Sequence, residues 1–282
     1  MSEAETPSPS TRPARRGRRR PLVSANWKMH HDHIVALHTV RDLGLRLKPE
    51  DTSTVEVSVH PPFTDLRTVQ VLVEGEGLPL ALGAQHCHPD DEGAFTGEVS
   101  APMLARLGVR YVIVGHSERR RLFSMTDEQV ATTMRAVLRH SMIPILCVGE
   151  STEERESGTT EKRLAAQLES ALEVLGPEQM ATLVIAYEPI WAIGSGTPAT
   201  PVDAADAAAF IRSTVSAAGG AAAGAGVRVQ YGGSVSAENA GQFLAEPDLD
   251  GLLVGGASLQ ATGFAEVIRA VGACYRSPAS KA

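Results

Sequence analysis

The chain has 282 residues and a formal net charge of −7, and 43% of its residues are hydrophobic. No apolar run approaches the roughly 20 residues that a membrane-spanning helix needs, which argues against a membrane protein and favours a soluble one. The three cysteines are widely spaced and form no CxxC pair, which argues against a disulfide framework or a zinc ribbon. They favour a reducing compartment, and we expect a cytoplasmic protein.

The first twenty residues differ in composition from the rest of the chain. They hold six arginines and two glutamates, a net charge of +4, so the remainder carries −11. Because they are rich in Pro, Ser and Arg and nearly lack large apolar side chains, we expect residues 1–20 to be a disordered extension without a signal-peptide core. A solvated tail, a transit segment and a contact with an anionic partner all remain open. The acidic body favours neither a nucleic acid nor a membrane as partner.

Past residue 20, short apolar runs alternate with longer segments rich in Ala, Leu, Arg and Glu. Nearly continuous Val, Ile and Leu is typical of parallel strands covered on both faces, and the segments between are long enough for crossover helices. Two of them open with capping boxes, Thr126…Gln129 and Ser151…Glu154. Eight such units predict an α/β fold, a single (β/α)8 barrel over residues 21–282. The runs are PLVSANWK (21–28), VEVSVHPP (55–62), LALGAQH (80–86), YVIVGHS (111–117), IPILCVGE (143–150), LVIAYEP (183–189), VRVQYGGS (227–234) and GLLVGGAS (251–258).

An open, doubly wound sheet is the alternative to closure. It is weakened because no GxGxxG motif follows an early strand. In a closed barrel, active sites lie where the strands end and the βα loops begin.

Polar residues gather at these strand ends. The first run ends in Asn26 and Lys28, the fourth in His116 and Glu118, and the sixth in Glu188. A carboxylate, an imidazole and an ammonium over one hollow fit proton transfer next to a carbonyl: a base, a donor to the oxygen, and a cation. Taken singly, each residue could equally be a solvated turn residue, a structural histidine or an exposed lysine.

The last three βα loops are rich in glycine, at 194–196, 232–234 and 255–258. Glycine lets a ligand approach the backbone closely, and the loops after strands seven and eight commonly hold phosphate in barrels. Ordinary turns are the alternative explanation.

These motifs together resemble the triosephosphate isomerase family over residues 21–275. The matching stretches are ANWKM (25–29), GAFTGEVS (93–100), YVIVGHSERR (111–120), PILCVGE (144–150), AYEPIWAIGSG (186–196), YGGSV (231–235) and DGLLVGGASL (250–259). The resemblance implies a (β/α)8 homodimer that interconverts dihydroxyacetone phosphate and glyceraldehyde 3-phosphate without cofactor or metal.

The resemblance also assigns roles to individual residues. Glu188 would be the base that moves a proton between C1 and C2, and His116 the neutral electrophile at the carbonyl oxygen. Lys28 and Asn26 would complete the polar pocket, with Glu118 beside Lys28. The backbone around four further residues would hold the phosphate: Gly194, Ser234, Gly255 and Gly256.

Two loops acquire a function through the same resemblance. Residues 189–191 would be the hinge, and residues 192–196 the tip, of a lid that closes over the substrate and protects the enediolate. Residues 93–100 would be a dimer loop whose Thr96 enters the partner's site and contacts Asn26, with Gln85 nearby. Without the resemblance, this second loop reads as an exposed glycine-rich turn.

Two positions depart from the family pattern. His30 stands where the family usually has Asn, and residues 197–199 read Thr-Pro-Ala where it usually has Lys-Thr-Ala. These departures leave open a four-carbon ketose phosphate, such as L-erythrulose 1-phosphate, as substrate. A catalytically inactive barrel that binds a partner through its arginine-rich extension is a third hypothesis, disfavoured because Lys28, His116 and Glu188 are intact.

Two histidine-rich stretches suggest a metal site, HHDH (30–33, with His38) and HCHPDD (86–91). Their spacing does not match the i, i+4 pattern that places two ligands on one helix face, so we expect no metal. Cys147 lies inside an apolar run, which favours a buried structural thiol over a nucleophile.

Overall fold

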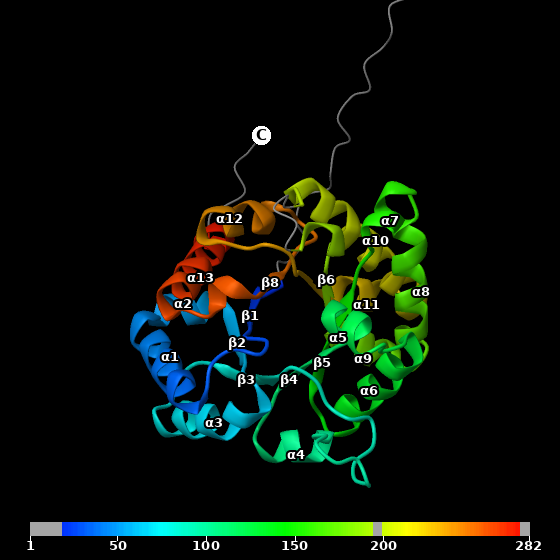
Figure 1. The fold of residues 1–282 in the computed structure, drawn as a ribbon. Helices are drawn as coiled ribbons and strands as arrows, with labels where there is room; N and C mark the ends of the chain where they lie inside the picture. Colours follow the sequence, from blue (N-terminus) through cyan, green and yellow to red (C-terminus); the bar gives the residue numbers. More distant parts are fainter. Residues whose placement is uncertain (1–18, 194–198, 277–282) are drawn as a thin grey trace, which may run out of the picture.

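The computed structural model describes residues 19–193 and 199–276, and it confirms the predicted barrel. Eight parallel strands close in chain order, with the first strand paired to both the second and the eighth. Figure 1 shows the helices arranged outside the ring of strands. Because all strands point the same way, their carboxyl ends meet at one end of the barrel. The strands are β1 (Leu22–Asn26), β2 (Glu56–His60), β3 (Ala81–Ala84), β4 (Tyr111–Val114), β5 (Ile143–Val148), β6 (Val184–Tyr187), β7 (Arg228–Tyr231) and β8 (Gly251–Val254).

Within the described residues, thirteen α-helices and three short 3-10 segments connect the strands. No helix among these residues is both long and apolar enough to cross a membrane. The α-helices are α1 (His33–Arg46), α2 (Pro49–Thr54), α3 (Leu66–Gly75), α4 (Ala101–Arg106), α5 (Ser117–Leu122), α6 (Asp127–Arg139), α7 (Thr152–Glu156), α8 (Thr160–Leu172), α9 (Pro177–Thr182), α10 (Pro201–Gly219), α11 (Ala221–Gly226), α12 (Ala237–Ala245) and α13 (Ala261–Arg276). The 3-10 segments are η1 (Phe63–Asp65), η2 (Ile190–Ala192) and η3 (Gly256–Ser258).

Both predicted capping boxes are present at helix starts. The Thr126 hydroxyl accepts from the Gln129 N–H at the start of α6, and the Gln129 side chain accepts from the Thr126 N–H. Ser151 and Glu154 make the same reciprocal pair at the start of α7. Each box satisfies two backbone donors that a helix start leaves unpaired. These local signals therefore fix where α6 and α7 begin.

A chain of buried polar side chains crosses the barrel interior. His60 Nδ1 lies 3.1 Å from the Ala84 carbonyl, which only accepts, so Nδ1 carries the proton and Nε2 of the neutral ring is an acceptor. The Ser58 hydroxyl lies 3.0 Å from Nε2 and 2.9 Å from the Ser24 hydroxyl, which Gln230 Nε2 reaches at 2.9 Å. Ser24, Ser58, His60 and Gln230 are fully buried, so their hydrogen bonds connect strands β1, β2, β3 and β7 inside the barrel.

We expect the stability of the fold to depend on the charge of His60. Burial lowers the pKa of His60 to about 4 from the ordinary 6.5, so between these values the unfolded chain binds the extra proton and the folded chain does not. The free energy of unfolding should therefore rise with pH across this window, by up to about 3 kcal/mol from this group. Urea unfolding at pH 4.5 and pH 7 should show a steeper pH dependence in the wild type than in His60→Gln. An equal pH dependence in both proteins would contradict the expectation.

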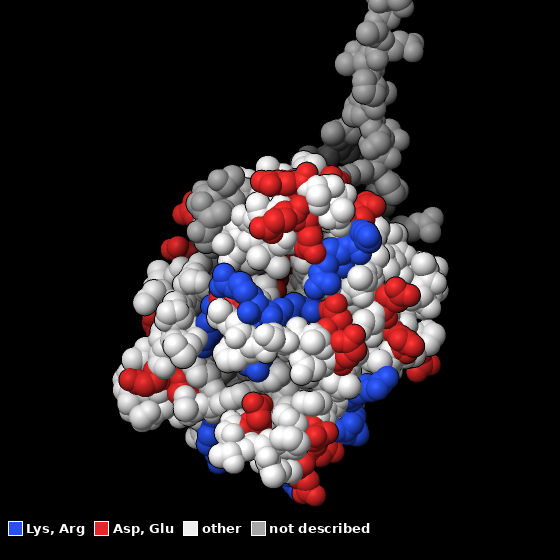
Figure 2. All heavy atoms as spheres, turned by 45° about the vertical axis from the view of Figure 1, so that its right-hand side comes forward, with Lys and Arg blue, Asp and Glu red and all other residues white. Residues whose placement is uncertain are grey.

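The last two residues of the predicted extension contact the barrel. Arg19 Nε forms an ion pair with Asp250 at 2.7 Å, and Arg20 donates to the Thr52 carbonyl in α2. Residues 1–18 lie outside the described residues, so the division into a disordered extension and a barrel stays a prediction. On the face in Figure 2, Lys and Arg side chains gather in a band across the middle, and Asp and Glu side chains are spread around it.

Candidate active site

The carboxyl ends of the strands bring seven of the predicted site residues to one hollow. Asn26 is the last residue of β1, His116 caps the start of α5, and Glu188 directly follows β6. The hollow has a volume of about 450 Å³. Its lining includes Asn26, Lys28, His116, Glu188, Ser234, Gly255 and Gly256.

The Glu188 carboxylate is buried, with only 2% of the residue exposed. Oε1 lies 3.0 Å from His116 Nε2, and Oε2 accepts from the Ser117 N–H at 2.9 Å. The Glu188 N–H donates to the Val148 carbonyl at 2.8 Å, which fixes its backbone against the end of β5. A buried carboxylate stays ionised only when it is paired and hydrogen-bonded, and both conditions hold here.

The contacts of the His116 ring define its neutral tautomer. Nδ1 accepts from the Glu118 N–H at 3.2 Å, so the proton of the neutral ring is on Nε2 and faces Glu188. The ring caps α5, whose first backbone N–H groups carry partial positive charge. A second proton on Nδ1 would break the hydrogen bond from the Glu118 N–H, so this backbone contact favours the neutral ring, whereas the carboxylates of Glu188 and Glu118, 3.0 Å and 3.7 Å from the ring nitrogens, favour its protonation.

The two groups shift each other's pKa in opposite directions. Burial disfavours the charged form of each, but their mutual attraction outweighs it, and the pKa of His116 is raised while the pKa of Glu188 is lowered. Cys147 in β5 also contacts Glu188; burial first, and then the carboxylate, raises the pKa of the Cys147 thiol well above its usual value. The thiol is therefore protonated and buried, as a structural group should be.

Lys28 reaches the hollow from a strained backbone. Its φ is 53°, an uncommon left-handed conformation for a residue other than glycine, which costs on the order of 1 kcal/mol or more. Two side chains hold this conformation: Asn26 Oδ1 accepts from the Lys28 N–H at 3.0 Å, and Gln85 Nε2 donates to the Lys28 carbonyl at 2.8 Å. The ammonium forms an ion pair with Glu118 at 2.6 Å. Glu118 thus lies beside Lys28 as predicted, outside the lining of the hollow.

The rest of the hollow's rim is formed by the short loops after β7 and β8, whose residues have small side chains or none, such as Ser234, Gly255 and Gly256. A Cβ on Gly256 would meet nothing within 4 Å, and one on Gly255 would lie 3.6 Å from Lys28 Cε, so the backbone here faces open space near the ammonium. The Ser234 carbonyl accepts from Asn239 Nδ2 at 3.1 Å, which braces the loop after β7. Asn239 also lines the hollow and was not predicted. Gly194, the fourth predicted rim residue, lies outside the described residues.

A second buried carboxylate, Glu150, was also missed from the sequence. It is fully buried after β5, where Oε1 accepts from the Tyr187 hydroxyl at 2.9 Å and from Trp191 Nε1 at 2.8 Å. Burial raises its pKa. Trp191 belongs to η2 and is the last residue of the predicted hinge 189–191, and Arg155 lies over its ring at 5.0 Å. The only sequence signal was the end of the PILCVGE run, which spacing alone could not connect to the tryptophan.

A second hollow, of about 390 Å³, adjoins the first and shares Asn26, Lys28 and His116 with it. Large apolar side chains line it and are left facing outwards: Met29 is 94% exposed, and Leu122 and Phe123 are each more than 60% exposed. Thr96 is exposed on the loop 93–100 and lines neither hollow of its own chain. The structure of the single chain therefore does not bring Thr96 to the site.

The histidine-rich stretches do not form a cluster. Across residues 19–193 and 199–276, no group of three His, Cys, Asp or Glu side chains is placed to hold a metal ion. His30 and His33 are exposed, while His31 packs edge-on against the Trp27 ring at 4.9 Å. These histidines therefore belong to the surface at the start of α1.

The fold and the hollow define the class: a (β/α)8-barrel protein with a buried carboxylate, an imidazole and a lysine at the carboxyl ends of its strands. The sequence model of the family described as triosephosphate isomerase matches residues 21–271. The chain therefore belongs to the triosephosphate isomerase family.

Three bacterial proteins named triosephosphate isomerase illustrate the similarity. The protein of Chloroflexus aurantiacus is 50% identical over 248 residues, which cover 88% of this chain and 98% of that protein. The protein of Symbiobacterium thermophilum is 49% identical over 252 residues, 89% of this chain and 97% of that protein. The protein of Cutibacterium acnes is 46% identical over 252 residues, which cover 89% of this chain and 97% of that protein. The similarity thus spans the whole barrel.

Proposed function

We propose that this protein interconverts dihydroxyacetone phosphate and D-glyceraldehyde 3-phosphate through an enediolate, without a cofactor or a metal. The observation that carries the proposal is the contact between the Glu188 carboxylate and His116 Nε2, 3.0 Å apart, in a hollow that also receives Lys28. The names of the relatives support the choice of substrate. A base, a neutral histidine and a closing loop are the known mechanism of this family.

In this proposal Glu188 transfers the proton between C1 and C2 of the substrate. The carboxylate is held by the Ser117 N–H, so it must turn away from that donor to reach a carbon-bound proton. The chain leaves room for this movement at Gly232, where a Cβ would lie 3.1 Å from Glu188 Cγ. The lowered pKa of Glu188 keeps the base ionised before substrate arrives.

His116 and Lys28 act on the oxygen atoms of the substrate. His116 donates its Nε2 proton in a hydrogen bond to the carbonyl oxygen, and the Lys28 ammonium stabilises the negative charge that develops there. Asn26 contributes by holding the Lys28 backbone. The phosphate binds at the backbone N–H groups of the rim around Ser234, Gly255 and Gly256, joined by Gly194 of the lid.

A coupled assay tests this function directly. The purified protein should convert both triose phosphates, and EDTA should leave the rate unchanged because no metal takes part. The same assay with L-erythrulose 1-phosphate tests the four-carbon alternative. Two departures motivated the alternative, and the one at residues 197–199 lies mostly outside the described residues. We expect a higher kcat/KM for the triose phosphate because the other, His30, is exposed and does not line the hollow. An equal or higher value for the tetrulose would reverse this assignment.

We also propose a homodimer in which loop 93–100 of one copy enters the second hollow of the other. The exposed apolar side chains of that hollow, Met29 and Phe123 among them, are what such a contact would cover. Thr96 would then approach Asn26 of the partner copy. Neither a nucleic acid nor a membrane is part of the proposal, and the odd number and wide spacing of the three cysteines favour the cytoplasm.

Thr96→Arg should dissociate this dimer, because a long charged side chain replaces a short one at the centre of the contact. We expect a monomer in sedimentation velocity and a kcat lower by about 10²-fold, the usual cost of a misplaced catalytic group. Thr182→Arg, at an exposed position of α9, is the matched control and should change neither property. A wild-type protein that sediments as a monomer with full activity would rule the proposal out.

A further inference from the structure

The side chain of Arg120 connects the ends of two barrel strands. Arg120 lies on α5, and only 12% of its side chain is exposed. Its Nε donates to the Gly115 carbonyl at 2.7 Å, at the end of β4, and its Nη2 donates to the Cys147 carbonyl in β5 at a longer 3.4 Å. One planar guanidinium therefore spans the two neighbouring strands at their carboxyl ends.

Both of these carbonyls belong to residues next to the catalytic pair. Gly115 directly precedes His116 in the chain, and the Cys147 thiol contacts the Glu188 carboxylate. Gly115 has a φ of 73°, and a Cβ there would lie 3.0 Å from Arg120 Nη2 and 2.8 Å from Val130. The guanidinium thus fills the space that the missing side chain leaves. Moving it would move the peptide from which the His116 ring projects.

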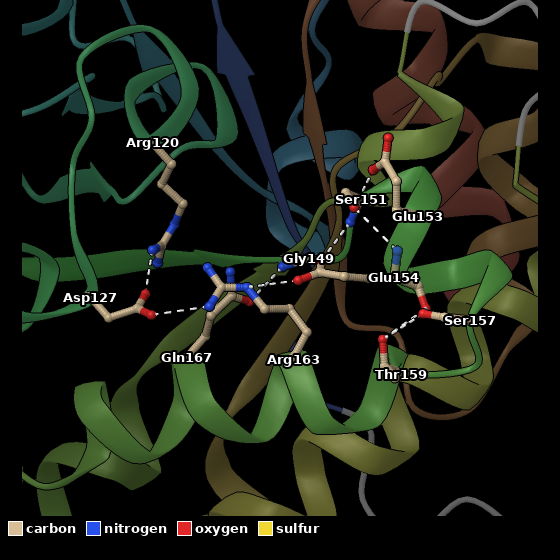
Figure 3. Close-up of polar contacts among 10 residues, drawn as sticks. All are labelled: Arg120, Asp127, Gly149, Ser151, Glu153, Glu154, Ser157, Thr159, Arg163 and Gln167. Atoms are coloured by element: carbon tan, nitrogen blue, oxygen red, sulfur yellow. Dashed lines mark hydrogen bonds and ion pairs between the residues drawn. The ribbon is translucent and has the colours of Figure 1, made fainter.

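Charged side chains of the outer helices α6 and α8 hold the Arg120 guanidinium in place, as Figure 3 shows. Asp127 at the start of α6 pairs with Arg120 Nη1 and accepts from Arg163 Nη1 of α8 at 3.2 Å. Arg163 Nε in turn lies 3.7 Å from Glu154. A buried cation is stable only when it is paired and its donors are satisfied, and these contacts meet both needs. The outer helices are thereby connected to the strand ends through one side chain.

We propose that Arg120 is a positioning residue that holds His116 in register with Glu188 by bridging the ends of β4 and β5. The inference rests on the proposed function, because it concerns the same two groups. Arg120 acts through backbone carbonyls and touches no substrate. The phosphate rim lies on the loops after β7 and β8, away from these contacts. Loss of the guanidinium should therefore lower kcat and spare KM.

Arg120→Met tests the inference, since it keeps much of the side-chain volume and removes every donor. We expect kcat, normalised to the folded fraction at the assay temperature, to fall about 10- to 100-fold, in line with the cost of an ångström-scale misplacement. KM should change less than threefold. Arg120→Lys retains the charge and a single donor nitrogen, which cannot bridge both carbonyls as the planar guanidinium does, so it should recover part of kcat. The matched control is Arg121→Met, at the exposed neighbouring position on α5, which should keep both constants.

An activity-independent signal separates positioning from simple stabilisation. The ring nitrogen resonances of His116 should shift in Arg120→Met and stay unchanged in Arg121→Met. If Arg120→Met does not fold, Arg163→Met, which removes the outer anchor of Asp127 together with the contact to Glu154, should shift the same resonances and lower kcat two- to fivefold at constant KM. A kcat for Arg120→Met within twofold of the control, or a loss confined to KM, overturns the inference. A wild-type protein without turnover overturns the proposed function, and the His116 resonances still decide the role of Arg120.

Discussion

Replacing Glu188 by Gln is expected to lower kcat by about 10²- to 10⁴-fold, the usual contribution of a positioned general base. The amide has the shape of the carboxylate, and its oxygen still accepts from the Ser117 N–H, so the fold should be kept. It has no lone pair basic enough to remove a carbon-bound proton. The substitution also removes the charge that attracts the proton of His116 at 3.0 Å. Steady-state kinetics in both directions measure the loss.

The matched control for this variant is Glu178→Gln, at an exposed position of α9. It makes the same chemical change without touching the hollow, and it should retain wild-type kcat and KM. KM of Glu188→Gln should stay within a few-fold of the wild type, because the substitution leaves the proposed phosphate-binding loops after β7 and β8 unchanged. Near-full kcat in Glu188→Gln would remove Glu188 from the role of base.

A second large effect is expected from Gly149→Ala. A Cβ at this position would lie 1.8 Å from the Glu188 carbonyl oxygen, far inside the contact distance of two atoms, so backbone must move. The Gly149 N–H is also fixed, since it donates to Gln167 Oε1 at 2.9 Å inside the core. The displacement therefore falls on residue 188. We expect a kcat lower by about 10²-fold and a free energy of unfolding lower by about 1–3 kcal/mol.

Gly75→Ala provides the matched control for this prediction. Gly75 ends α3, and a Cβ there would meet nothing within 4 Å. This variant should keep its activity, and its free energy of unfolding should rise by about 0.5–1 kcal/mol, because alanine restricts the conformations of the unfolded chain. Thermal unfolding and kcat measured on both variants separate a steric effect at the site from a general effect of the substitution. A Gly149→Ala protein with wild-type kcat would show that the strand end adapts without moving Glu188.

The architecture was predictable because its signals are local. A buried parallel strand has a continuous apolar run, and a helix start has a capping box such as Thr126…Gln129, whatever the rest of the chain does. Eight strands in chain order follow from eight such runs. The positions of Lys28, His116 and Glu188 at the ends of these runs placed them at one mouth, because parallel strands all end on the same side.

The roles of these residues needed more than their positions. A glutamate after a strand is compatible with a solvated turn residue as well as with a base in a site. The resemblance to the triosephosphate isomerase family is what favoured the base. Positions covered by that resemblance could be named individually. Asn239, which lies outside the matching motifs, was not found. Glu150, which contacts Trp191, ends the matching stretch PILCVGE, but the stretch alone does not connect it to the tryptophan, so it was not found either.

The amino-acid sequence by itself determined the eight βα units, the starts of helices such as α6, and the set of polar side chains at the mouth. Only the tertiary structure decided which groups meet: the left-handed backbone of Lys28 held by Gln85, the polar chain through His60, and the guanidinium of Arg120 between two strands. The physical reason is the distance along the chain over which each kind of signal acts. Propensity and capping act within a few residues, whereas Gln85 and Lys28, Ser58 and Ser24, and Arg120 and Cys147 are 57, 34 and 27 positions apart. The distances between such residues are set by strand register and barrel closure.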